Sequence, residues 1–214
     1  MSLFITFEGG EGCGKSTQSK ALWERLSQSG VPVELTHEPG GTALGNEIKR
    51  LLKTEITTEI SSQTELLLFG ASRTQLMTEV IMPNLRKGNV VICDRFADST
   101  TVYQGYGRGI DLSTIKAVND LATQGIRPDL IILLDIPAEQ GLRRKRNKEI
   151  DRFESEDIGF HRRIRDGYLK LAAEEPGRWF MIDATMAKAR ISDIIWERVR
   201  QMLSTDKGAN PKYG

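Results

Sequence analysis

The sequence has few of the features that mark secreted or membrane proteins. Its 214 residues include only two cysteines, Cys13 and Cys93, which are too few for a disulfide framework and point to a reducing compartment. No apolar run reaches the roughly 18 residues that span a bilayer. The first seven residues lack the basic start and cleavage site of a signal peptide. We therefore predict a cytoplasmic protein with no membrane partner.

An excess of charge of one sign is also missing. The 30 Lys and Arg residues nearly balance the 29 Asp and Glu residues, which gives a formal net charge of +1. No global field would therefore attract nucleic acid, and any basic chemistry must be local. We expect residues 1–204 to form one domain. The polar stretch 205–214 contains Gly and Pro, and we expect it to be a flexible tail.

Short apolar runs alternate with helical patterns along the chain. The runs predict strands at Leu3–Phe7, Val31–Leu35, Val90–Cys93, Leu130–Leu134 and Trp179–Ile182. Helices are expected at 16–29, 42–53, 64–87 with a break at Pro83, 112–123, 138–148, 156–174 and 187–203. Such alternation is typical of a parallel sheet covered on both faces. The predicted fold is an α/β, doubly wound, five-stranded parallel sheet.

A glycine-rich loop follows the first predicted strand. The eight residues from Gly9 to Ser16 match G-x-x-x-x-G-K-[ST] without a gap and open a predicted helix, a context that makes an incidental glycine-rich turn a poor explanation. Backbone amides of such a loop bind phosphate, the lysine reaches the β- and γ-phosphates, and the serine hydroxyl binds Mg²⁺. The predicted ATP-binding residues are Gly9, Gly10, Glu11, Gly12, Cys13, Gly14, Lys15, Ser16 and Thr17.

The third predicted strand ends in Asp94 and Arg95. An acid at this position can hold the Mg²⁺ shell, so Ser16 and Asp94 are the candidate metal ligands. Arg95 stands where motor ATPases commonly have an acid that activates water, and an arginine there suits a second phosphate-bearing substrate. A salt bridge at the strand end is the alternative. A GTPase is disfavoured because the nearest match to a guanine-reading motif, at residues 147–150, lacks its Asp.

Several longer motifs lie between residue 7 and about residue 184. They are Glu38-Pro-Gly-Gly-Thr42, Phe69-x-x-x-Arg73-x-Gln75, Asp94-Arg95 with Ser99-Thr100, Tyr103-Gln104-Gly105, Gly107-Arg108-Gly109, Arg127-Pro-Asp-Leu130 and Asp151-Arg-Phe-Glu154. Together they resemble the motifs of bacterial thymidylate kinases. The resemblance implies a nucleoside monophosphate kinase that uses Mg²⁺ to transfer the γ-phosphoryl group of ATP to dTMP. It also implies a role in dTTP biosynthesis and a homodimer.

The resemblance also implies roles for residues of the acceptor site. Phe69 would stack on the thymine ring, Arg73 would hydrogen-bond the base, and Thr101 would present a polar side chain to it. Tyr103 would crowd a 2′-hydroxyl and so favour deoxyribose. Glu38 and Gln104 lie within the matching motifs, and the resemblance implies that they also bind the substrate. Packing in the core remains the alternative for Phe69 and Tyr103.

The phosphate of the acceptor is expected to bind cations. Arg95 would bind it, and Glu11 would bind the sugar 3′-hydroxyl and help to orient the metal. The helix after the Glu38 loop usually supplies another arginine in this family. Here the aligned residue is Lys49, with Arg50 beside it, and a solvated helix face explains both residues equally well. Which of the two binds phosphate stays open.

The segment Arg143–Lys148 places five cations in six residues. It could be a solvated helix face, a nucleic-acid patch or a lid that closes over phosphates. The neighbouring Asp151-Arg152 and the kinase motifs favour a lid at about 143–154. Because the P-loop contains no arginine, the resemblance implies that the lid supplies the catalytic cation. The predicted catalytic residues are Lys15, Arg95, Arg146 and Arg152, with Arg143 as a weaker candidate.

The acceptor phosphate is already anionic near neutral pH, so no general base is expected and His37 and His161 are predicted to be structural or exposed. A further hypothesis places the Cys13 and Cys93 sulfurs together near the phosphates, as targets of oxidation, and the alternative is that both are inert small residues. Two rival classes remain. One is a P-loop switch that hydrolyses nucleotide slowly, and the other is a nucleic-acid binder that uses ATP.

Overall fold

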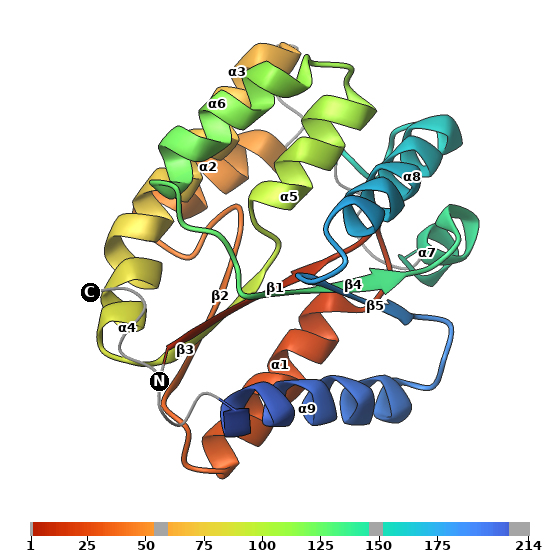
Figure 1. The fold of residues 1–214 in the computed structure, drawn as a ribbon. Coiled ribbons are helices and arrows are strands. Elements are labelled where there is room, and N and C mark those ends of the chain that lie inside the picture. Colours follow the sequence, from red (N-terminus) through yellow and green to blue (C-terminus); the bar gives the residue numbers. More distant parts are fainter. Residues whose placement is uncertain (1, 54–59, 146–151, 206–214) are drawn as a thin grey trace.

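The computed structural model describes residues 2–53, 60–145 and 152–205. Five parallel strands form its sheet: β1 (Leu3–Glu8), β2 (Val33–His37), β3 (Val90–Asp94), β4 (Leu130–Asp135) and β5 (Trp179–Asp183), in the order β2-β3-β1-β4-β5 (Figure 1). The central strand β1 pairs with β3 on one side and β4 on the other. The predicted doubly wound parallel sheet is confirmed.

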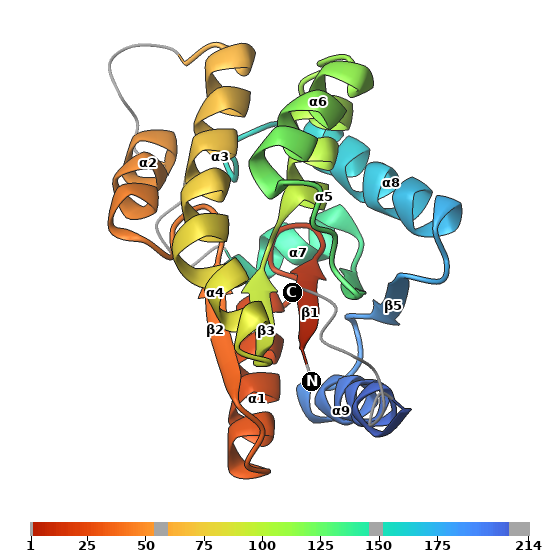
Figure 2. The same ribbon diagram turned by 60° about the vertical axis from the view of Figure 1, so that its left-hand side comes forward.

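Helices cover both faces of the sheet (Figures 1 and 2). The α-helices are α1 (Lys15–Gln28), α2 (Ala43–Lys53), α3 (Ser62–Leu76), α4 (Met82–Arg86), α5 (Ala97–Thr100), α6 (Leu112–Thr123), α7 (Ala138–Lys145), α8 (Ile158–Glu174) and α9 (Lys188–Thr205). Two π-helical segments, η1 (Met77–Ile81) and η2 (Thr101–Gly107), continue α3 and α5. Helices α1 and α9 lie together on one face of the sheet, and the larger group lies on the other. Within the described ranges, no helix is both long and apolar enough to cross a membrane.

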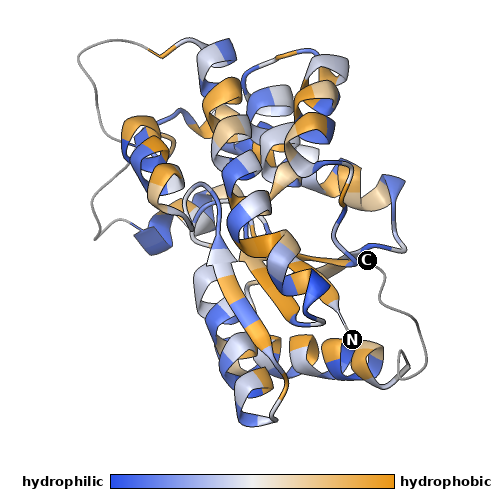
Figure 3. Cartoon of the chain, turned by 90° about the vertical axis from the view of Figure 1, so that its left-hand side faces the viewer, coloured by the Kyte–Doolittle hydropathy of each residue, from blue (hydrophilic) through white to orange (hydrophobic). Residues whose placement is uncertain are grey.

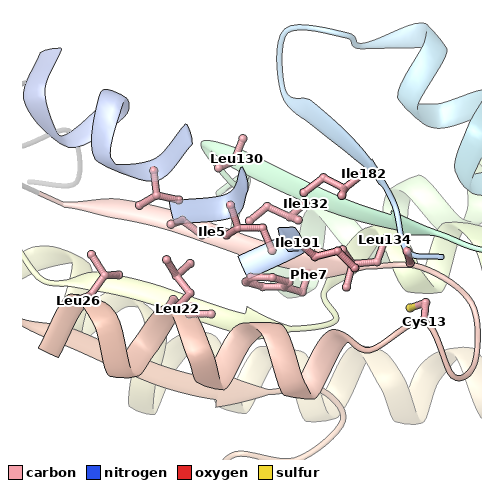
Figure 4. Packing of buried hydrophobic residues seen from close by; sticks show 14 of the residues in the cluster. Ile5, Phe7, Cys13, Leu22, Leu26, Leu130, Ile132, Leu134, Ile182 and Ile191 are labelled. Carbon is pink, nitrogen blue, oxygen red and sulfur yellow. The ribbon is translucent and has the colours of Figure 1, made fainter. Parts of the chain in front are cut away.

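The core divides at the sheet because neighbouring strand residues point to opposite faces. On the α1 and α9 side, Ile5 and Phe7 pack with Leu22 and Ile191 (Figure 4). On the other side, Phe4 belongs to a separate cluster with residues of α3, η1 and α4. Burial on both faces explains why the strands read as continuous apolar runs. Figure 3 shows the central strands largely orange, while the surrounding helices alternate between orange and blue.

Some predicted boundaries differ from the structure. Strand β2 begins at Val33, two residues later than predicted, because the Val31 amide donates to Leu26 O and completes the end of α1, and Pro32 has no N–H. The predicted break in the helix at 64–87 is confirmed in part. The α-helix α3 gives way to the π-helical segment η1, and a new helix, α4, begins directly after η1 with Pro83 in its first turn. The helical segment α5–η2 was missed.

Candidate active site

The phosphate loop lies at the carboxyl edge of the sheet, between β1 and α1. Two of its glycines leave no room for a side chain. A Cβ on Gly9 would lie 2.5 Å from Leu134 O, and one on Gly12 would lie 2.0 Å from Gly141 O. Both have positive φ, 138° and 70°. The loop therefore packs directly on the backbone of α7, the helix that leads into the predicted lid.

Lys15 and the start of α1 are the parts of the loop that could bind an anion. The Lys15 ammonium is almost buried and donates to Gly9 O at 3.0 Å and to Gly10 O at 2.8 Å. Helix α1 has no side-chain cap and no acid in its first turn. The Thr17 amide donates to Gly14 O at 3.1 Å, so the amides that precede it, including that of Ser16, are the ones that can serve a phosphate.

Two oxygen atoms that could act as metal ligands lie close together beside the loop, on Ser16 and Asp94. The Ser16 hydroxyl donates to Asp94 Oδ2. A hydroxyl and a carboxylate are ligands that Mg²⁺ accepts, and Mg²⁺ usually completes its octahedron with water and substrate phosphate. In the described part of the chain, no group of three or more His, Cys, Asp or Glu side chains could hold a metal. The donor set therefore fits Mg²⁺ bound together with a nucleotide.

Arg95 connects the phosphate loop to a neighbouring cleft. Its φ of 72° is unusual for a residue with a side chain. The guanidinium donates to Gly9 O at 3.2 Å and to Glu11 Oε1 at 2.5 Å, and it lies over the Tyr103 ring. Arg95 thus places a positive charge between the loop and the cleft.

Glu11 binds three groups at once. It accepts hydrogen bonds from Arg95, from the Tyr103 hydroxyl at 2.9 Å and from Lys145 Nζ at 2.6 Å. Burial raises the pKa of Glu11, but the charges of Arg95, Lys15 and Lys145 outweigh it and hold the pKa well below its usual value. Lys145, at the end of α7, was not singled out among the basic residues of the sequence.

A fully buried acid, Glu8, holds the turn at Arg95. Its carboxylate accepts from Phe96 N at 2.8 Å, from Ser99 Oγ at 2.6 Å and from Tyr168 Oη at 2.9 Å. Burial, followed by the nearby Asp98 charge, raises the pKa of Glu8 to about 7. Sequence reasoning missed Glu8, because its partners lie about 90 and 160 residues further along the chain.

A cleft lies beside Arg95, with about 480 Å³ of space that is open in part to solvent. Residues from the phosphate loop, the segments after β2 and β3, α2, α3, α5, η2 and the segment before α8 line it: Glu11, Glu38, Pro39, Lys53, Phe69, Arg95, Ser99, Thr100, Tyr103, Gln104 and Phe153. Most of the predicted acceptor residues are among them.

Aromatic rings form one wall of the cleft. The Phe69 and Phe153 ring centroids are 5.9 Å apart, and those of Tyr103 and Phe153 are 6.1 Å apart. Thr101 does not line the cleft, because its hydroxyl donates to Ala97 O at 3.3 Å. The preceding Thr100 lines it instead.

Arg73 lies behind the wall of the cleft. It is fully buried and donates Nε to Glu38 Oε2 at 2.9 Å, with a second bond from Nη2 to Glu38. Its other donors reach Asn119 Oδ1 and Thr100 Oγ1, each at 2.6 Å. Burial raises the pKa of Glu38 and the Arg73 charge opposes that rise. The structure thus places Arg73 beneath Glu38 and Thr100, which themselves face the cleft.

The structure distinguishes Lys49 from Arg50. Arg50 pairs with Glu47, and both side chains are about two-thirds exposed. Lys49 is half-buried, and its pKa is lowered by burial and by Lys53, against the effect of Asp94. Lys53, one helical turn further, lines the cleft. The spacing of Lys49 and Lys53 by four residues was the signal in the sequence that could have identified Lys53.

Arg146 lies outside the described residues, as does all of 146–151. Arg152 pairs with the buried acid Glu65 and donates Nε to Leu52 O at 3.2 Å. It is therefore not brought to the phosphate loop in this structure. Lys145 is the cation of the lid base that reaches the loop.

The two cysteines lie on opposite faces of the sheet, Cys13 in the α1 and α9 cluster and Cys93 in the α3 and α4 cluster. Burial raises the pKa of the Cys93 thiol well above its usual value. The hypothesis that the two sulfurs come together is not supported. His161 is buried beside Phe160, in agreement with a structural role.

Comparisons with known proteins agree with this geometry. A family model described as thymidylate kinase matches residues 7–195. A thymidylate kinase of Dehalococcoides mccartyi is 54% identical over 203 residues, covering 95% of this chain and 98% of that protein. One of Trichlorobacter lovleyi is 47% identical over 209 residues, covering 94% and 99%.

A solved structure of a thymidylate kinase is also similar to this chain. The crystal structure of thymidylate kinase from Ehrlichia chaffeensis superposes with a TM-score of 0.74 at 38% identity, covering 94% of this chain and 98% of that one. The family model and the curated relatives each extend over nearly the whole chain. This chain belongs to the thymidylate kinase family.

Proposed function

We propose that this chain transfers the γ-phosphoryl group of ATP to dTMP, giving dTDP and ADP in dTTP biosynthesis. The observation that carries the proposal is the junction at Arg95 and Glu11. These two residues link the phosphate loop to a cleft with aromatic walls, so two phosphorylated ligands can meet end to end. Neither a lone triphosphate switch nor a nucleic-acid site requires such a second cleft.

The two sides of the junction bind different phosphates, those of ATP and that of the acceptor. The loop amides and Lys15 bind the ATP phosphates, and Ser16 and Asp94 would hold Mg²⁺, which supplies charge neutralisation to the phosphates. Arg95 binds the acceptor phosphate, with Lys49 and Lys53 behind it. A phosphate monoester has a second pKa of about 6, so it needs no general base. Catalysis then consists of in-line positioning and charge neutralisation.

The aromatic wall receives the base. Phe69 and Phe153 offer ring faces on which a pyrimidine can stack, and Thr100 and Gln104 offer polar groups to its edge. Tyr103 and Glu11, which share a hydrogen bond, lie between the base wall and the phosphates and suit the sugar. Arg73 and Glu38 hold this wall in place.

The lid supplies the remaining cation. Arg146 stays the candidate from the sequence, and Lys145 at the base of the lid lies against Glu11. A transition-state arginine is worth about 10³-fold or more in rate. Closure over the phosphates would also exclude water and so prevent ATP hydrolysis.

A panel of acceptors tests the proposal. ADP formation from MgATP is followed with dTMP, dUMP, dCMP or dGMP, with DNA or RNA, and with buffer alone. A thymidylate kinase turns over rapidly with dTMP and hardly at all with buffer. A nucleotide switch gives the same slow rate in every sample, and a nucleic-acid enzyme responds to DNA or RNA. Either of those results rejects the assignment.

We also propose a cytoplasmic homodimer. Leu67 on α3 and Leu121 on α6 are 62% and 80% exposed, and the two helices pack side by side. Light scattering after gel filtration should give twice the chain mass of 24.0 kDa. Replacing both leucines by glutamate should yield a monomer. A wild-type monomer at micromolar concentration would contradict the dimer.

A further inference from the structure

A buried acid outside the cleft controls one side chain inside it. Glu65, in the first turn of α3, is fully buried. Its Oε1 accepts from Gln104 Nε2 at 2.8 Å and from Arg108 Nε at 3.4 Å, and its Oε2 accepts from Arg152. The two arginines supply the charge compensation that a buried carboxylate requires. Gln104 lines the cleft, whereas Glu65 does not.

This contact fixes which end of the Gln104 amide faces the cleft. A carboxylate can only accept hydrogen bonds, and an amide has one donor end and one acceptor end. The NH₂ group of Gln104 must therefore face Glu65, and Oε1 is left for the cleft. Flipping the amide would bring two oxygens together in a buried place, which is costly.

Thr100 offers the complementary group. Its Oγ1 accepts a bond from Arg73 Nη2 at 2.6 Å, so the hydroxyl hydrogen remains available to a ligand in the cleft. The wall thus presents an acceptor at Gln104 and a donor at Thr100. Thymine and uracil carry an N3–H donor beside a carbonyl acceptor, which matches this pair. Cytosine carries a bare N3 beside an amino group, which is the reverse pattern.

We propose that Glu65 determines the selectivity for thymine-like bases over cytosine by fixing the orientation of the Gln104 amide. It is a positioning residue, since it acts through Gln104 and not on the base. The proposal rests on the proposed function. It also gives Arg152 a task at the end of the lid, namely compensation of the Glu65 charge.

The variant Glu65→Gln tests this role. Its side-chain amide can donate to Gln104 Oε1, so Gln104 can flip and present its NH₂ to the cleft. We expect the ratio of kcat/KM for dTMP over dCMP to fall by about ten- to a hundredfold. The ratio of dTMP to dUMP should not change, because both bases have the same N3–H and carbonyl edge. KM for ATP should also stay the same.

The exposed Gln75–Glu79 pair gives a matched control, because Gln75 Nε2 also donates to a glutamate there. Glu79→Gln should leave every ratio unchanged. Gln104→Leu, which removes the amide, should lower the dTMP to dCMP ratio whether or not Glu65→Gln folds.

The outcomes separate the two proposals. A wild-type protein that does not prefer dTMP to dCMP contradicts both the proposed function and the role of Glu65. A selective wild-type protein overturns the role of Glu65 alone if Glu65→Gln keeps the wild-type ratio or loses activity equally on all acceptors. Full selectivity in Gln104→Leu overturns it as well.

Discussion

The Arg73–Glu38 pair should be among the costliest contacts to break in this protein. Glu38→Gln keeps the shape of the side chain but removes the charge that faces Arg73. The Arg73 side chain is fully buried and that of Glu38 is 2% exposed, so water cannot replace the lost partner. Breaking a buried pair in this way costs about 3–5 kcal/mol. For a domain of this size, the Tm should fall by roughly 6–20 °C.

The Arg50–Glu47 pair offers a matched control in the same molecule. Its side chains are 66% and 69% exposed, and such pairs contribute about 0–1 kcal/mol. Thermal and urea unfolding of Glu38→Gln and Glu47→Gln in one buffer therefore compare the loss of stability caused by the same chemical change in a buried pair and in an exposed pair. Equal losses of stability in the two variants would refute the reasoning.

A double replacement separates stability from function. Glu38→Leu with Arg73→Met replaces both charges with apolar groups of similar size, which is often neutral for stability. We expect the double variant to lose less stability than Glu38→Gln, because no charge is left unpaired, although Asn119 Oδ1 and Thr100 Oγ1 each lose a donor. We also expect a strong loss of dTMP turnover, because the wall beneath Thr100 loses these hydrogen bonds. A double variant with full activity would show that the pair serves packing alone.

Three further outcomes follow from the site. Lys15→Met should lower kcat by about 10²-fold or more in the ATP and dTMP assay, because Lys15 is the cation of the phosphate loop; an unchanged kcat would be a contradiction. Lys49→Met should raise KM for dTMP about tenfold while Arg50→Met leaves it unchanged, and equal effects would count against the orientation of α2. Glu8 has a folded pKa of about 7 against an ordinary 4.5, so its stabilising effect is complete below pH 4.5 and is lost as pH rises through 7. The contribution of Glu8 to the free energy of urea unfolding should therefore fall by about 3 kcal/mol between pH 4.5 and 7, and Glu8→Gln should abolish this fall. If the free energy of unfolding depended on pH in the same way in the variant and the wild type, the raised pKa would be contradicted.

The phosphate loop with Ser16, and the strand end with Asp94 and Arg95, were predictable because each lies within a short, continuous motif. The local sequence alone requires a strand, a glycine turn and a helix from residue 3 to residue 28. The sequence predicted a parallel, doubly wound sheet but not the order of its strands, because the pairing of β1 with β3 and β4 depends on contacts between distant segments.

Two of the buried acids could not be predicted from the sequence. Glu8 and Glu65 have no local signature, and their partners come from segments about 40 to 160 residues away. The placement of Thr100 instead of Thr101 at the cleft depends on the helical phase of α5 and η2, which sequence reasoning missed. Arg152 was assigned to catalysis because its charge is visible in the sequence, whereas its partner Glu65 is visible only in the fold.

The identity of the phosphoryl acceptor tests the central claim most directly. The protein is incubated with MgATP and an equal concentration of dTMP, and ³¹P NMR identifies the products. The account predicts that the γ-phosphoryl signal is replaced by the resonances of dTDP and ADP in equal amounts, with little inorganic phosphate. ADP and inorganic phosphate as the only products, with dTMP unchanged, would contradict it.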